Sequence, residues 1–131
     1  MQSLLLLIIA LYCVNGFQND VLYQTGIHLS NVTSVTGYKG QLTNARRVPP
    51  IQQISCVGGA AMNHQHQVSA IQCTNSGFNG HDYEWKCTPQ APSHLKLGRA
   101  RVSCEGFNSA EDSYKLVNSC GIKYTLEYNQ L

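Results

Sequence analysis

The alternation of apolar and polar residues predicts short β-strands along most of the chain. In residues 122–128 every second residue is apolar, which is the pattern of a strand with one buried face. Residues 82–87 repeat this pattern, with Tyr83, Trp85 and Cys87 on one side and charged residues on the other. In residues 94–104 the facing is ambiguous, because apolar residues fall on both sides. Further β-favouring runs cover residues 21–23, 27–29, 32–38, 51–57 and 68–73.

Turn-forming residues separate these runs. Pro49-Pro50 interrupts any regular element, since proline lacks an amide donor. Residues 75–80 are rich in Asn and Gly and predict a turn, and residues 88–92 contain two prolines and predict a second break. No window keeps an apolar period of 3.6 residues, so helix is limited to a turn around 109–114. Many short strands at this spacing predict an all-β sandwich or barrel, and we favour a β-sandwich of short antiparallel strands.

The first residues predict a signal peptide. An apolar block at 4–11 is too short for a membrane span, which needs about 20 apolar residues. Small Val14 and Gly16 stand at the −3 and −1 positions before Phe17, although no Lys or Arg precedes the block. We therefore expect a signal peptide at 1–16 and one exported β-domain at 17–131. No later stretch is long and apolar enough to span a bilayer, so the product is expected to be soluble in the lumen or outside the cell.

Five cysteines remain after the signal peptide, and their spacing predicts disulfide bonds. The candidates are Cys56, Cys73, Cys87, Cys104 and Cys120. An oxidising compartment favours bridges, and no C-x-x-C pair indicates zinc or redox chemistry. The count is odd, so one thiol stays unpaired and the pairing of the others stays open. The unpaired thiol is either buried and inert or links two chains into a homo-oligomer.

The charge balance argues against nucleic acid as a partner. The chain carries nine basic and seven acidic residues, for a formal charge of +2, and they are scattered along the sequence. Positive charge concentrates only at Arg46-Arg47 and in the looser set Lys96, Arg99 and Arg101. A nucleic-acid binder would show a continuous basic stripe.

Three histidines suggest a metal site, but a simpler interpretation is favoured. His64 and His66, with His81 further on, carry imidazoles that suit zinc or copper. No Cys or Asp stands at a metal-site spacing beside them, so no metal is expected. For catalysis, Gly-x-Ser-x-Gly is absent, and no Cys lies beside a plausible histidine motif. We therefore expect neither an enzyme nor a cofactor.

Two acidic or polar features concern modification and calcium. Asn31-Val32-Thr33 is an N-glycosylation sequon, which predicts an exposed, glycosylated Asn31 in an exported chain. Glu105, Glu111 and Asp112 lie close in sequence and could bind calcium, but they lack the ligand order of an EF-hand. A solvated turn, with Ser109 as its capping residue, is favoured over a calcium site.

Blocks of residues around the cysteines resemble a known family. They read Cys-Val-Gly-Gly at 56–59, Ile-Gln-Cys at 71–73, Tyr-Glu-Trp-Lys-Cys at 83–87, Val-Ser-Cys-Glu-Gly-Phe at 102–107 and Ser-Cys-Gly at 119–121. In this order they resemble the luminal part of the store-operated calcium entry-associated regulatory factor (SARAF) family. The resemblance covers about residues 33–129.

The resemblance implies a function that the residues alone do not. Members are type I proteins of the endoplasmic reticulum membrane that restrain store-operated calcium entry. Their cytosolic part acts on the STIM calcium sensor and promotes slow inactivation of the Orai channel, and the luminal domain modulates this activity with store state. The family has no catalytic residues to carry over. We therefore expect a non-catalytic luminal domain of a negative regulator of calcium entry.

Two departures from the family pattern matter. The family has a further cysteine near the position of Asn63, and its absence here accounts for the odd count. The chain also stops at Leu131, before the membrane span and cytosolic segment of the family. If it truly ends there, the alternative is a secreted, disulfide-stabilised binding module for an extracellular partner.

Overall fold

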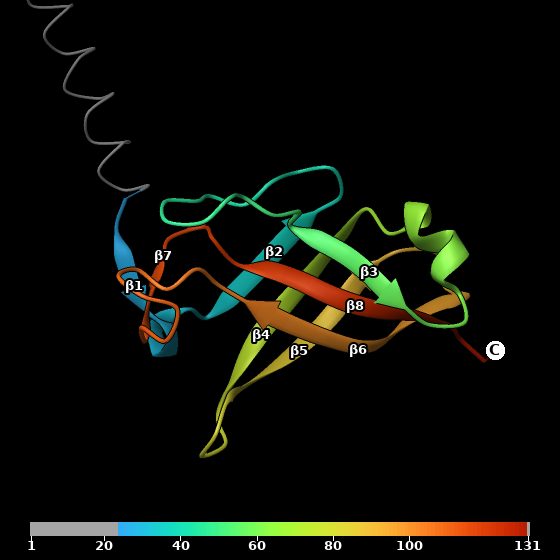
Figure 1. The fold of residues 1–131 in the computed structure, drawn as a ribbon. Helices are drawn as coiled ribbons and strands as arrows, with labels where there is room; N and C mark the ends of the chain where they lie inside the picture. The colour runs from blue at the N-terminus through green and yellow to red at the C-terminus, as the bar shows by residue number, and fades with distance from the viewer. Residues whose placement is uncertain (1–23, 131) are drawn as a thin grey trace, which may run out of the picture.

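The computed structural model describes residues 24–130, and their regular structure is almost entirely β-strand (Figure 1). The described elements are β1 Gly26–His28, η1 Leu29–Asn31, β2 Ser34–Tyr38, β3 Ile54–Gly58, η2 Met62–Gln67, β4 Ala70–Phe78, β5 Tyr83–Gln90, β6 Leu95–Ser103, β7 Tyr114–Leu116 and β8 Gly121–Tyr128. η1 and η2 are short 3-10 helices. The predicted signal peptide at 1–16 and the predicted strand at 21–23 lie outside the described residues. The predicted all-β class is confirmed.

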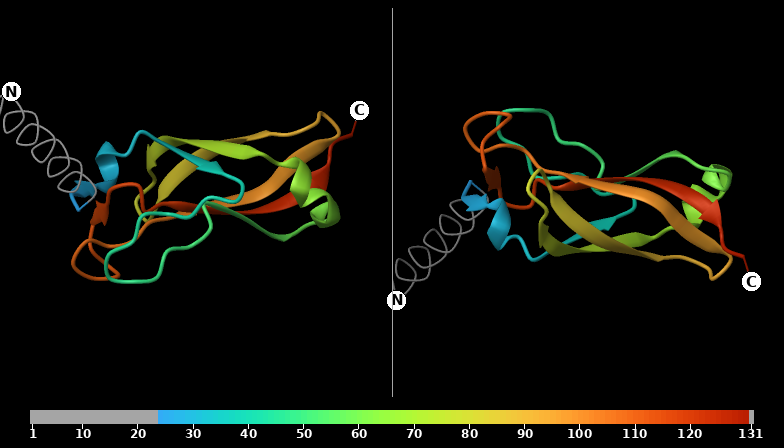
Figure 2. Two further views of the ribbon diagram at one scale, coloured as in Figure 1. Left: turned by 90° about the horizontal axis from the view of Figure 1, so that it is seen from above. Right: turned by 90° about the horizontal axis from the view of Figure 1, so that it is seen from below.

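Two three-stranded sheets and one two-stranded sheet make up the fold. Their orders are β2-β4-β5, β3-β8-β6 and β1-β7. Views from above and below show the chain doubled into an elongated body, with β1 and β7 at one end and η2 at the other (Figure 2). Both larger sheets contribute to one buried cluster, which includes Val35, Ile71 and Cys73 from the first and Ile122, Tyr124 and Leu126 from the second. Two sheets that pack face to face as a sandwich share a core in this way. The sandwich packing of these two sheets stays a prediction.

One strand pair contradicts the expectation of antiparallel strands throughout. β3 pairs with β8 in parallel, with Ile54 opposite Ile122 and Cys56 opposite Tyr124. Antiparallel neighbours can be joined by a tight hairpin, whereas parallel neighbours need a long connection. The chain between β3 and β8 supplies one, because it first builds β4, β5, β6 and β7.

The turn predicted at 75–80 is wrong for residues 75–78. β4 continues through Phe78, with a bulge between Asn75 and Gly77. Gly77 has a φ of 107°, which a glycine accepts without steric cost, so the strand absorbs the irregularity. The reversal comes later, where the side-chain oxygen of Asn79 accepts hydrogen bonds from the amides of His81 and Asp82, each 2.9 Å long.

The break predicted at 88–92 also begins too early, since β5 includes Pro89 and ends at Gln90. β5 is an edge strand, which is where a sheet tolerates proline. Cys73 and Cys87 face each other with their Cα atoms 4.0 Å apart, the close spacing of a pair without ladder hydrogen bonds. Pro89 lies two residues beyond Cys87 and pairs with Ile71, so its nitrogen points away from β4.

A bulge explains the ambiguous facing of residues 94–104. The register of β6 against β8 shifts between Leu97 and Ala100. Leu95 and Leu97 therefore point inward before the bulge, and Ala100 and Val102 point inward after it. An extra residue in a strand reverses the inward and outward positions that follow.

Candidate functional site

Four of the five cysteines within residues 24–130 form crosslinks. Disulfides join Cys73 to Cys87 across β4 and β5, and Cys104 to Cys120 between the end of β6 and the start of β8. Cys56 is a half-buried thiol whose Sγ lies 3.4 Å from the carbonyl oxygen of Gly58. Burial, with a smaller contribution from the neighbouring Cys56, raises the pKa of Tyr124 to about 12. Tyr124 therefore stays neutral in the core at physiological pH.

Asn31 is the last residue of η1 and is exposed. Its position on the surface leaves room for a glycan. Glycosylation at Asn31 stays a prediction.

Glu105 is buried and holds the segment that contains the two consecutive arginines. Its carboxylate accepts hydrogen bonds from the amides of Arg46, at 3.1 Å, and Arg47, at 3.0 Å. Burial acts to raise the pKa of Glu105, but these amides, that of Val48 and the charge of Arg47 outweigh it and hold the pKa below its ordinary value. The guanidinium of Arg46 lies 4.1 Å from the ring centroid of Phe107. Glu105 is thus engaged in structure.

Asp112 also serves its own loop. Its two oxygens accept hydrogen bonds from the amides of Asn108, at 2.9 Å, and Tyr114, at 3.0 Å, and these bonds lower its pKa. The amide of Asp112 donates to the carbonyl oxygen of Ser109, which closes a turn rather than the helical turn predicted around 109–114. That helical prediction is wrong, because the chain must extend into β7 at Tyr114.

The histidines considered as metal ligands lie in two different parts of the described structure. His64 lies near His66, His94 and Tyr128, with ring centroids 6.3, 6.2 and 5.7 Å away. His81 instead follows β4, in the β4–β5 turn. Within residues 24–130, no group of three His, Cys, Asp or Glu side chains has the geometry to hold a metal ion.

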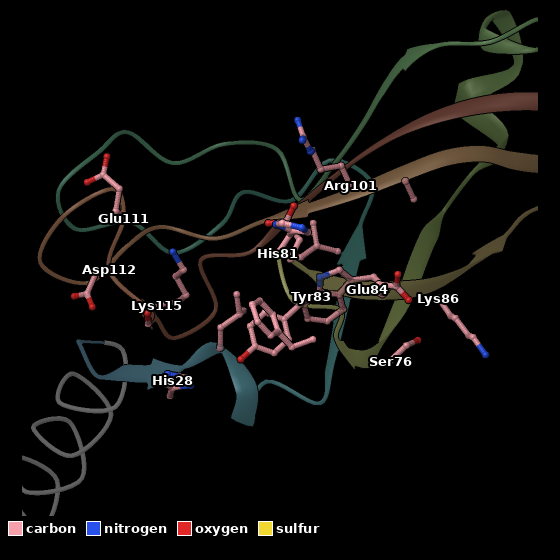
Figure 3. Close-up of a pocket in the computed structure, with 17 residues that line it drawn as sticks. His28, Ser76, His81, Tyr83, Glu84, Lys86, Arg101, Glu111, Asp112 and Lys115 are labelled. Carbon is pink, nitrogen blue, oxygen red and sulfur yellow. The ribbon is translucent and has the colours of Figure 1, made fainter.

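An open groove of about 740 Å³ lies beside the β4–β5 hairpin, and we call it the hairpin groove. Its walls come from β1, the hairpin, β6 and the segment 111–115, and Figure 3 shows Asp112 and Lys115 across it from Tyr83. The lining includes His28, Phe78, Tyr83, Trp85, Lys86, Arg101, Asp112 and Lys115. Sequence reasoning gave no sign that β1 and β7 would meet these hairpin residues.

The aromatic side chains of the hairpin divide into two roles. Trp85 is half-buried and packs against the shared core. Phe78 is 59% exposed, and its ring centroid lies 5.1 Å from that of Tyr83. Tyr83 is half-buried, so Phe78 is the exposed member of this pair. An exposed aromatic ring among charges of both signs suits contact with another protein. The structure thus separates Trp85, which packs against the core, from Phe78, which lies at the surface.

The described part of the chain has no helix long and apolar enough to cross a membrane.

Comparisons with known proteins show that most of the chain is similar to proteins of one kind. The chain is 39% identical over 108 residues to the store-operated calcium entry-associated regulatory factor of Xenopus tropicalis, covering 82% of this chain and 34% of that protein. It is 38% identical to that of Rattus norvegicus over 130 residues, covering 99% and 39%. It is 41% identical to that of Homo sapiens over 103 residues, covering 79% and 30%.

The chain thus spans between 30% and 39% of the length of these curated relatives. The model of a family described as SOCE-associated regulatory factor of calcium homoeostasis matches residues 3–131. The chain therefore belongs to the SARAF family.

Proposed function

We propose that this chain is the luminal regulatory domain of a negative regulator of store-operated calcium entry in the endoplasmic reticulum. The observation that carries the proposal is the family match along residues 3–131. The two disulfides support an oxidising compartment, such as the lumen of the reticulum. The signal peptide at 1–16 and a glycan on Asn31 belong to the same proposal.

The domain would act by binding rather than by catalysis. The hairpin groove is our candidate contact site, because it combines the exposed Phe78, packed against half-buried Tyr83, with charged residues around them. Aromatic side chains commonly anchor protein interfaces, and surrounding polar groups set specificity. The cytosolic partners, a STIM-type sensor and an Orai-type channel, would be reached through a segment outside these 131 residues.

The test is a calcium measurement in cells that lack their own SARAF. The complete transcript product that carries this chain would be expressed with a tag, and cytosolic calcium followed after store depletion and calcium readdition. Retention in the reticulum with a faster decline of calcium entry would support the proposal. Release of the product into the medium, with no change in calcium entry, would favour the secreted binding module.

A surface substitution tests the groove separately. Phe78→Ser combined with Tyr83→Ser removes the aromatic pair of the groove, and Tyr38→Ser removes a 53% exposed ring at the end of β2 as a matched control. We expect the groove variant to lose the effect on calcium entry while the control keeps it. A groove variant that is folded, retained in the reticulum and fully active would show that the contact site lies elsewhere.

A further inference from the structure

The outer face of the sheet β3-β8-β6 carries a group of basic side chains that we call the basic face. Its members are Lys96, Arg99 and Arg101 on β6 and Lys123 on β8, all exposed. The bulge in β6 is what gathers them, because it reverses the facing after Leu97. Without it, Lys96 and Arg101 would lie on opposite faces of the strand.

Like charges face each other on the basic face. Arg101 lies directly opposite Lys123 in the strand register, and like charges in that position destabilise a sheet. No hydrogen bond or ion pair within residues 24–130 engages the cationic group of Arg99, Arg101 or Lys123. The nearest carboxylate by register belongs to Glu127, which pairs with Lys96 and accepts a hydrogen bond from the amide of Ala60 at 3.1 Å. The fold therefore leaves the positive charge uncompensated.

A hollow of about 700 Å³ lies among these cations. Besides Arg99, Arg101 and Lys123, it is lined by Val57, Ala100, Tyr124 and Thr125. The side chain of Val57 is 57% exposed at its border. An apolar depression with a basic rim is complementary to an apolar group flanked by negative charges.

We propose that the basic face binds an acidic, extended protein segment, with carboxylates over Arg99, Arg101 and Lys123 and an apolar side chain in the hollow. Arg99 and Arg101 are two residues apart on a strand, which places their Cα atoms about 7 Å apart. Alternate side chains of an extended segment have the same spacing. Guanidinium groups also bind carboxylates through two parallel hydrogen bonds. The site is separate from the proposed hairpin groove, although Arg101 borders both.

An anionic membrane is the less favoured occupant. Proteins that lie on a bilayer insert several apolar side chains between the headgroups. Among the large outward side chains of this face, Val57 is the exposed apolar one, and its neighbours form a concave surface that a flat bilayer would not fill.

Binding of a labelled peptide to the oxidised chain tests the proposal. The probe is a fluorescein-labelled peptide in which Glu alternates with Val and Ser, and its partner has Gln in place of every Glu. Fluorescence anisotropy should show binding of the Glu peptide alone, weakening as salt rises. Arg101→Gln combined with Lys123→Gln should reduce its affinity about fivefold or more, from two exposed ion pairs.

A matched variant separates the site from net charge. Lys86→Gln combined with Lys115→Gln removes the same charge from the hairpin groove and should leave the affinity unchanged. Equal losses in both variants would overturn the proposal in favour of nonspecific attraction. Failure of the Glu peptide to bind would also overturn it, as would sedimentation with phosphatidylserine vesicles without peptide binding, which would assign the face to a membrane. Neither result would bear on the calcium measurement.

Discussion

Replacing Glu105 by Gln should destabilise the fold in a pH-dependent way. The carboxylate accepts hydrogen bonds from the amides of Arg46 and Arg47, at 3.1 and 3.0 Å, in a buried position. Gln has the same size, but its side-chain nitrogen would face one of these amides as a second donor. One of the two hydrogen bonds is then lost, and the remaining one no longer has a charged acceptor.

The magnitude follows from these two contacts. A hydrogen bond to a charged group contributes about 1.5–3 kcal/mol, and solvent around the exposed arginine side chains reduces that value. We expect Glu105→Gln to lower the free energy of unfolding by about 1–3 kcal/mol at pH 7. The folded-state pKa of Glu105 is below its ordinary value of 4.5, so its contribution is present above that value and is lost as pH falls through the folded pKa.

Urea denaturation of the oxidised chain, repeated from neutral to acid pH, measures both effects. The difference in the free energy of unfolding between wild type and Glu105→Gln should have its largest value at pH 7 and should decrease on acidification. Glu111→Gln is the matched control, because Glu111 is exposed in the same segment and should change little. Equal stability of Glu105→Gln and wild type at pH 7, or a difference that grows in acid, would refute the reasoning.

Three further variants test separate parts of the structure. Cys73→Ala with Cys87→Ala opens a loop with a sequence separation of 14 and should lower the free energy of unfolding by about 3 kcal/mol. An unchanged midpoint of chemical denaturation would contradict a stabilising role of this disulfide. Gly59→Ala should lower the melting temperature, because φ is 101° and the new Cβ would collide with the backbone of β8; an unchanged melting temperature would show that the segment relaxes freely. Lys123→Glu should raise the free energy of unfolding by roughly 0.5 kcal/mol, because it turns the opposition with Arg101 into attraction, while abolishing acidic-peptide binding. A less stable Lys123→Glu would contradict the repulsion.

Local periodicity predicted the strands whose facing never changes. Tyr83, Trp85 and Cys87 share the inner side of β5 as the alternation indicated, and Ile122 and Tyr124 do so in β8. The period of two is a property of the backbone, so it is readable wherever the strand is regular.

Features that depend on distant residues could not be read from the sequence. The bulge in β6 breaks the alternation, and only the partner strand reveals it. The cysteine pairing depends on which strands become neighbours, and so does the parallel pairing of Ile54 with Ile122. Glu105 looked like a calcium candidate because its amide partners, Arg46 and Arg47, lie 59 and 58 residues earlier.

The central position of β8 in its sheet has a consequence for how the protein is made. β3 and β6 flank β8 and do not pair with each other, so neither has a partner in that sheet until residues 121–128 have been synthesised. During synthesis, the β4–β5 hairpin can form early, while Ile54 in β3 and Leu95 in β6 still lack the strand that pairs with both of theirs. Completion of this sheet therefore follows the arrival of β8, and until then the unpaired edges of β3 and β6 are open to pairing with other chains.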